Sequence, residues 1–220
     1  MTSPPSDAVS HFGLASARDL VWAHAVNSIA LLEAALADDS GVHMLEVDLM
    51  LSREGVEAHR DGRVVRASDV LLAHPLPTHA TEPDLSRASD LDFETFVRAI
   101  VAHVRAEGAR RIGVKLDFKE LSCVEPCVAR LKDAGVGAPE RRGFLGTGIG
   151  SPKRAAALAA TPLWLNADVV RGPGGRDPID GERFVDLCAA ACPTATLSLG
   201  CVLSSHWSPY DRVRVVNAVP

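Results

Sequence analysis

Charged side chains recur at one parity of the predicted strands, and the clearest case is the segment Ile112 to Lys119. Successive strand side chains point to opposite faces, so Lys115, Asp117 and Lys119 share one face while the apolar residues share the other. Helical patterns precede and follow this segment, which favours a parallel sheet covered by helices. Charges enclosed by such a sheet must pair with one another or bind a metal or an anion.

The same parity selects polar residues on other predicted segments. The candidates for chemistry are His24, Glu46, Asp48, His74, Lys115, Asp117, Lys119, Asn166 and Asp168. Glu46 and Asp48 stand two residues apart on one strand, and such carboxylates suit a hard divalent cation, Mg²⁺ or Ca²⁺, with Asp117 as a third ligand. The imidazoles suit proton transfer near neutral pH, and the lysines suit a negatively charged substrate group.

Each candidate also has a purely structural interpretation. A single inward carboxylate could do no more than pair with Lys115, and a lone histidine is more often a core residue than a catalyst. The number of polar residues at one parity on separate segments favours a functional site.

The order of the predicted elements indicates an α/β fold. Strands are expected at 19–27, 43–52, 112–119, 161–170 and 195–202, with a short apolar run at 70–74 and one more strand at 213–219; helices are expected at 29–37, 89–108, 120–134, 152–160 and 182–191. Polar inward faces favour a closed TIM-type (β/α) barrel over an open doubly wound sheet, whose central strands are apolar on both faces. Such a barrel typically needs about 250 residues, so 220 residues predict a barrel incomplete at its C-terminus. We expect a flexible lead-in at 1–18 and a single barrel domain at 19–220.

Further segments of the sequence have interpretations of their own, and two of them allow more than one. Residues 53–66 are predicted to form a hairpin-like excursion, and 78–88 a polar loop. Gly146-Thr-Gly148-Ile-Gly150 could cradle a phosphate, but a plain turn is the preferred interpretation. The pairs Cys123/Cys127 and Cys188/Cys192 could hold zinc, although buried structural thiols are favoured.

Composition excludes several partners. A formal charge of −5 and a pI near 5.9 leave no basic footprint for nucleic acid or an anionic membrane. No apolar run approaches the roughly 20 residues of a membrane span, and no export signal is visible, so a cytoplasmic location is the default expectation.

Six ordered motifs resemble one known family. They are Trp22-Ala-His24-Ala-Val-Asn27, Met44-Leu-Glu46-Val-Asp48, Ala73-His74-Pro75, Lys115-Leu-Asp117-Phe-Lys119, Trp164-Leu-Asn166-Ala-Asp168 and Ala195-Thr-Leu-Ser198-Leu-Gly200. Together they are similar to the menorin (FAM151) family, over roughly residues 20–200. That family is grouped with phospholipase-C-like phosphodiesterases, which are TIM barrels with a divalent metal.

The resemblance implies a role for each residue of the site. It implies His24 and His74 as the acid/base pair with Lys119 contacting the phosphate, and Glu46, Asp48 and Asp117 as metal ligands. Substrate-binding positions would be Lys115, Asn166, Asp168, Trp164, Asn27 and Ser198. Animal menorins are extracellular or membrane-associated, so the resemblance leaves an extracellular location open.

This sequence departs from the family pattern in three respects: residues 53–66 look like an insertion, the chain is shorter at its C-terminal end, and no export signal is visible. His59, in the excursion after Asp48, competes with His74 for the role of second histidine. The family continues with two further strands and a helix, so an incomplete barrel here would favour oligomerisation.

Two function classes follow. The first is a metal-dependent hydrolase acting on a small phosphodiester or lipid headgroup, of the glycerophosphodiester or lysophospholipid type. The second is a catalytically silent menorin-like barrel that binds a ligand or a protein. A truncated fragment that self-associates through an open sheet edge is a third interpretation.

Overall fold

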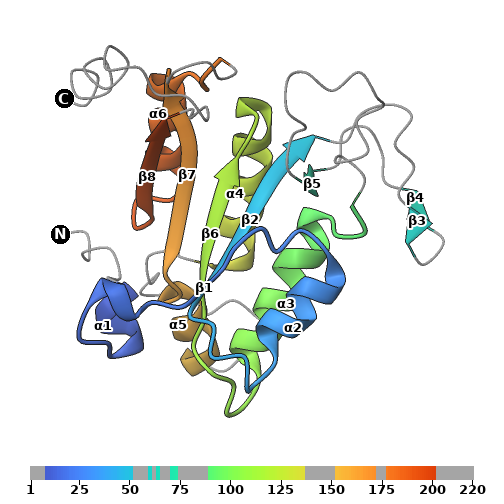
Figure 1. Ribbon diagram of the computed structural model, residues 1–220, viewed down its shortest axis with the longest axis vertical. Helices are drawn as coiled ribbons and strands as arrows, with labels where there is room; N and C mark the ends of the chain where they lie inside the picture. The colour runs from blue at the N-terminus through green and yellow to red at the C-terminus, as the bar shows by residue number, and fades with distance from the viewer. Residues whose placement is uncertain are drawn as a thin grey trace.

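The computed structural model describes residues 8–51, 70–73, 89–136, 152–171 and 177–201, together with the backbone of a short hairpin at 59–60 and 63–64. Its main sheet has the strand order β1-β2-β6-β7-β8, and all neighbours in this order are parallel (Figure 1). These strands are β1 (Trp22–Ala23), β2 (Met44–Leu51), β6 (Gly113–Phe118), β7 (Leu163–Val170) and β8 (Thr196–Cys201). The five parallel strands therefore lie side by side in the order in which they occur along the chain.

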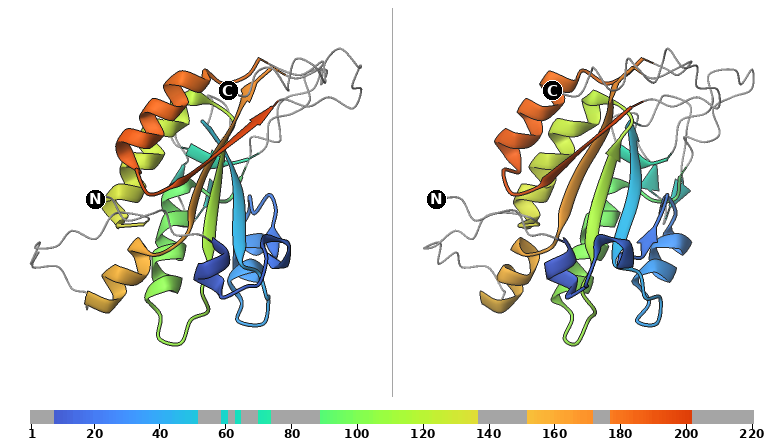
Figure 2. Two further views of the ribbon diagram at one scale, coloured as in Figure 1. Left: turned by 90° about the vertical axis from the view of Figure 1, so that its left-hand side faces the viewer. Right: turned by 60° about the vertical axis from the view of Figure 1, so that its left-hand side comes forward.

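Helices connect the parallel strands. They are α2 (Ile29–Leu36), α3 (Phe93–Arg105), α4 (Val124–Ala134), α5 (Pro152–Ala159) and α6 (Gly181–Ala191). Figure 2 shows α4 and α6 together on one side of the sheet. Local signals set several ends: Ser28, Asp92 and Asp180 accept hydrogen bonds from first-turn amides, and Gly135 ends α4 in the left-handed conformation that glycine tolerates.

The hydrophobic core lies between the helices and one face of the sheet. Leu45, Val47 and Leu49 of β2 are fully buried there, as are Leu116 and Phe118 of β6. The alternate residues of the same strands, with the charged groups, point to the other face. The predicted division into an apolar and a polar face is confirmed for β2 and β6, whereas Leu199 on the predicted apolar face of β8 is exposed.

The remaining elements are short. Before β1 stand α1 (Ala8–Phe12) and the 3-10 turn η1 (Ala17–Asp19), so the predicted lead-in contains a helix; η3 (Leu121–Cys123) precedes α4. The predicted excursion contains the antiparallel hairpin β3 (His59–Arg60) and β4 (Arg63–Val64). The expected strand at 213–219, the loop at 78–88 and the glycine-rich segment at 143–150 lie outside the described residues.

Two details of the predicted fold need correction. The strand expected at 19–27 is reduced to β1, because η1 ends just before it and Ala25 adopts a left-handed backbone with φ of 53° that no extended strand accommodates. The segment β5 (Val70–Leu72) runs antiparallel to β2, so the sheet is mostly rather than wholly parallel.

The sheet is an arc in the part of the chain that is described. Its order runs from β1 to β8 without a pairing between these two strands. The structure is therefore α/β with a mostly parallel sheet, compatible with a barrel-like fold. None of the described helices is long and apolar enough to cross a membrane.

Candidate functional site

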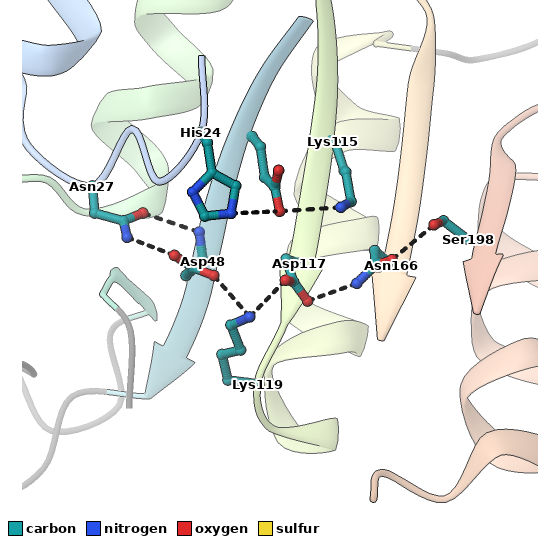
Figure 3. Close-up of polar contacts among 9 residues, drawn as sticks. His24, Asn27, Asp48, Lys115, Asp117, Lys119, Asn166 and Ser198 are labelled. Atoms are coloured by element: carbon teal, nitrogen blue, oxygen red, sulfur yellow. Dashed lines mark hydrogen bonds and ion pairs between the residues drawn. The ribbon is translucent and has the colours of Figure 1, made fainter. Parts of the chain in front are cut away.

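The strand register gathers the predicted residues into two rows on the polar face. Glu46 lies opposite Lys115, which lies opposite Trp164; Asp48 lies opposite Asp117, which lies opposite Asn166, and Asn166 lies opposite Ser198. Figure 3 shows Asp48, Lys115, Asp117, Asn166 and Ser198 projecting from one face of the sheet. Residues as far apart in sequence as Glu46 and Lys115, 69 positions, thus meet because the parallel strands are neighbours in space.

Lys119 joins the two carboxylates of the row formed by Asp48, Asp117 and Asn166. Its Nζ lies 2.8 Å from Asp48 Oδ1 and 2.5 Å from Asp117 Oδ2. The Lys119 side chain is only 6% exposed. Burial alone would lower the pKa of Lys119, but the ion pairs with Asp117 and Asp48 and the hydrogen bonds to them outweigh it, so the pKa is raised above the ordinary lysine value.

Amide side chains hold the other oxygen of each aspartate. Asn27 Nδ2 donates to Asp48 Oδ2 at 2.7 Å, while the Asp48 backbone N–H donates to Asn27 Oδ1 at 3.0 Å. Asn166 Nδ2 donates to Asp117 Oδ1 at 2.8 Å, and Ser198 Oγ donates to Asn166 Oδ1 at 2.7 Å (Figure 3). Both carboxylates are therefore fixed in orientation.

The row of Glu46 and Lys115 contains the third carboxylate, and a histidine lies beside it. Lys115 Nζ donates to Glu46 Oε1 at 3.1 Å, and His24 Nε2 lies 3.7 Å from the same oxygen. The His24 side chain is 74% exposed, so its imidazole is open to solvent. A carboxylate that contacts an accessible imidazole can orient it for proton transfer.

The backbone around His24 is held in an unusual conformation. Ala25 has positive φ, the Val26 N–H donates to Glu46 O at 2.8 Å, and Ser89 Oγ donates to Asn27 O at 2.7 Å. Nothing in the residue types marks this turn, although the His-Ala-Val-Asn motif spans it. Strained backbone of this kind is commonly found at functional sites.

Two indoles lie at one end of the polar face. Trp22 and Trp164 meet edge to face, with ring centroids 5.4 Å apart. Trp164 Nε1 is buried, and among the described residues it has no hydrogen-bond partner. The pair gives the polar face an apolar end.

Some predicted residues do not join this arrangement. Asp168 lies opposite Gly200 in the register, two residues after Asn166 and on the same face of β7. His74 lies outside the described residues, and His59 begins β3 with its backbone alone described. The choice between the two histidines therefore stays a prediction.

The carboxylates fit a divalent cation in kind and partly in geometry. The described residues contain no group of three or more His, Cys, Asp and Glu side chains placed to hold a metal ion. Asp48 and Asp117 do bracket a positive charge, and Mg²⁺ is often bound through one or two carboxylates with water and substrate phosphate completing its shell. Glu46 does not share that position, because it contacts Lys115.

The cysteines contribute no ligands to the polar face. Cys123, Cys127, Cys188 and Cys192 are all buried in the hydrophobic core. Burial raises the pKa of the Cys188 thiol to about 12 and that of Cys127 well above its ordinary value. These groups pack as small apolar side chains.

Comparisons with known proteins agree with the motifs. The family model described as the Menorin N-terminal domain matches residues 16–140 and 151–210. Human Protein FAM151B is 28% identical over 192 residues, which cover 87% of this chain and 51% of that protein. The chain thus spans about half the length of this curated relative, and no solved structure matches. With the family model matching most of its length, the chain belongs to the menorin family.

Proposed function

We propose that this chain is a phosphodiesterase-like (β/α) barrel protein that binds a phosphodiester anion on the polar face of the sheet. One observation carries the proposal: Asp48, Asp117 and Glu46 lie buried beside Lys119 and Lys115 on the face opposite the helices. Buried ionic groups seldom stabilise a protein more than apolar side chains of the same size would, so a functional role is the better explanation.

The barrel part of the proposal has its own support. Sequential parallel strands with connecting helices packed on one face are the arrangement of a (β/α) barrel arc. In such barrels the interior-facing residues near the carboxyl ends of the strands form the site. Asp117 is the next-to-last residue of β6, and Asp48 of β2 and Asn166 of β7 lie beside it in the register.

The net charge of the side chains on the polar face supports a metal-dependent function. Three carboxylates and two ammonium groups leave the cluster of Glu46, Asp48, Lys115, Asp117 and Lys119 with one net negative charge. An anion is repelled by such a cluster. A divalent cation held by Asp48 and Asp117 would reverse the sign and supply electrostatic stabilisation to phosphate oxygens.

The protein groups supply positioning and proton transfer. His24 is accessible and lies near Glu46, so its imidazole can accept a proton from an attacking hydroxyl or donate one to a leaving oxygen. His74 or His59 would complete the acid/base pair. Lys119 and Lys115 can each donate to a phosphate oxygen when they release a carboxylate.

The test is hydrolysis of glycerophosphodiesters and lysophospholipids by the purified protein with Mg²⁺ or Ca²⁺. His24→Ala and Glu46→Ala should abolish turnover while far-UV circular dichroism stays unchanged. Glu33→Ala, on the exposed face of α2, is the control and should retain full activity. Equal turnover in wild type and His24→Ala would refute the catalytic assignment.

The alternative is a catalytically silent member of the family that binds a ligand or a protein. Every carboxylate of the cluster already has a lysine partner, which is the observation that favours it. In that case divalent cations or phosphodiesters would raise the melting temperature of the protein without any hydrolysis.

A further inference from the structure

Lys119 enters the site from beyond the end of β6. Its backbone N–H donates to Leu49 O at 3.0 Å, which anchors the residue to β2. The side chain then turns back over the sheet, so that its ammonium lies between Asp48 and Asp117 (Figure 3). The residue is tethered firmly, while the ammonium is at the end of a flexible stem.

The two aspartates each offer one oxygen to this ammonium. Their second oxygens are engaged by amides, Asp48 Oδ2 by Asn27 and Asp117 Oδ1 by Asn166. The remaining pair, Asp48 Oδ1 and Asp117 Oδ2, therefore forms a position for one cation between β2 and β6. Lys119 Nζ occupies that position at 2.8 and 2.5 Å.

A divalent cation and an ammonium cannot use these two oxygens together. A cation bound to Asp48 Oδ1 and Asp117 Oδ2 would stand within a few ångströms of Nζ, where two positive charges repel strongly in a site shielded from water. The amides of Asn27 and Asn166 hold each aspartate in the orientation that gives one oxygen to this position. One of the two must leave.

We propose that Lys119 is a tethered competitor of the divalent cation: its ammonium neutralises Asp48 and Asp117 when no cation is bound, and cation binding displaces it toward the anionic substrate. This inference rests on the cation-binding part of the proposed function. Displacement gives Lys119 free N–H donors only when the site has gained positive charge, so cation and phosphodiester bind cooperatively. Lys119 is then a positioning residue for the empty site and a substrate contact in the loaded one.

Lys115 provides the internal comparison. Among the described residues its ion-pair partner is Glu46, at 3.1 Å, and its side chain is 18% exposed against 6% for Lys119. It does not lie between Asp48 and Asp117. Its removal therefore should not open the cation position.

The experiment is a titration with MgCl₂ and CaCl₂, by calorimetry and by thermal melting, of wild type, Lys119→Met and Lys115→Met. Without cation, Lys119→Met should melt lower than wild type. It should bind the cation at least tenfold more tightly, because about tenfold to a hundredfold is the factor for one charge-assisted hydrogen bond and Lys119 makes two, to Asp48 and Asp117. Its melting temperature should accordingly rise more with added cation than that of wild type. Lys115→Met should bind the cation within about threefold of wild type, a change well under one hydrogen bond.

A second measurement covers the case in which Lys119→Met folds poorly without cation. In wild type, acetylation of lysines by an activated ester, followed by peptide mass spectrometry, should show slow labelling of Lys119 that speeds up when cation is added. Recovery of folded Lys119→Met by cation would also support the proposal.

Three results would overturn the inference. They are cation affinity in Lys119→Met equal to or below that of wild type, Lys119 labelling unchanged or slowed by cation, and no cation binding by either protein. Failure of the proposed function alone looks different: competition would be observed in the titration while no phosphodiester is hydrolysed.

Discussion

The two-way contact between Asn27 and Asp48 offers the most direct test of the site geometry. Asn27→Ala removes the donor to Asp48 Oδ2 and the acceptor for the Asp48 backbone N–H. Asp48 is 1% exposed, so little water is available to replace either partner. The substitution leaves a buried carboxylate and a buried amide each without one bond.

The magnitude follows from those two losses. A hydrogen bond to a charged group contributes about 1.5–3 kcal/mol and a neutral one about 1 kcal/mol, so we expect a loss of about 2–4 kcal/mol in the free energy of unfolding. For a domain of this size each kcal/mol shifts the melting temperature by about 2–4 °C, which predicts a decrease on the order of 10 °C.

The assay is urea unfolding and thermal melting in cation-free buffer, with Ser198→Ala as the matched control. Among the described residues, Ser198 Oγ donates to Asn166 alone, at the half-buried end of the same network, so its loss should cost about 1 kcal/mol or less. If Asn27→Ala were no less stable than Ser198→Ala, Asn27 would not be fixing Asp48, and the preorganised cation position argued above would lose its basis.

Three further predictions concern the backbone, a lysine and the thiols. Ala25→Gly should leave the melting temperature unchanged or higher, because glycine adopts positive φ freely, whereas Ala34→Gly on the exposed face of α2 should cost about 1 kcal/mol in urea unfolding; equal losses would contradict the strained conformation of Ala25. The pKa of Lys119 is raised in the folded state, so its stabilising contribution is complete below the ordinary lysine pKa and is lost as the pH rises through the raised value. Urea unfolding in cation-free buffer above about pH 10.5 should therefore show wild type losing stability faster than Lys119→Met, and parallel curves would argue against the buried ion pairs. Iodoacetamide at neutral pH should modify half-buried Cys201 before the four buried cysteines, whose labelling should require unfolding. Rapid modification of Cys188, whose pKa is raised to about 12, would contradict its burial between α6 and the core.

Strand parity was the part of the fold that sequence could predict. The alternation in Met44 to Leu51 and in Gly113 to Phe118 is set by side-chain burial alone, so it identified Glu46, Asp48, Lys115 and Asp117 as one face before any coordinates. Helix ends followed from Ser28 and Gly135 for equally local reasons. Each of these signals depends only on neighbours in the sequence.

The sequence could not predict which lysine of the site pairs with which carboxylate. Nothing in the spacing says that Lys119 rather than Lys115 reaches Asp48, because that depends on the chain turning back after β6 and on the Lys119 N–H bonding to Leu49 O. The early end of β1 was missed for a similar reason. Ala25 has no intrinsic preference for positive φ and takes it only because Val26 bonds to Glu46 and Asn27 to Asp48.

The contacts in the structure give Asn27, Asn166 and Ser198 a different role from the one expected from the sequence. Asn27, Asn166 and Ser198 were expected to contact substrate, and that expectation still needs a substrate to test it. In the structure their amide and hydroxyl groups contact Asp48, Asp117 and one another. A side chain that already fixes a carboxylate contributes to specificity through that carboxylate. Substitution of these amides should therefore weaken cation binding first, and substrate affinity only as a consequence.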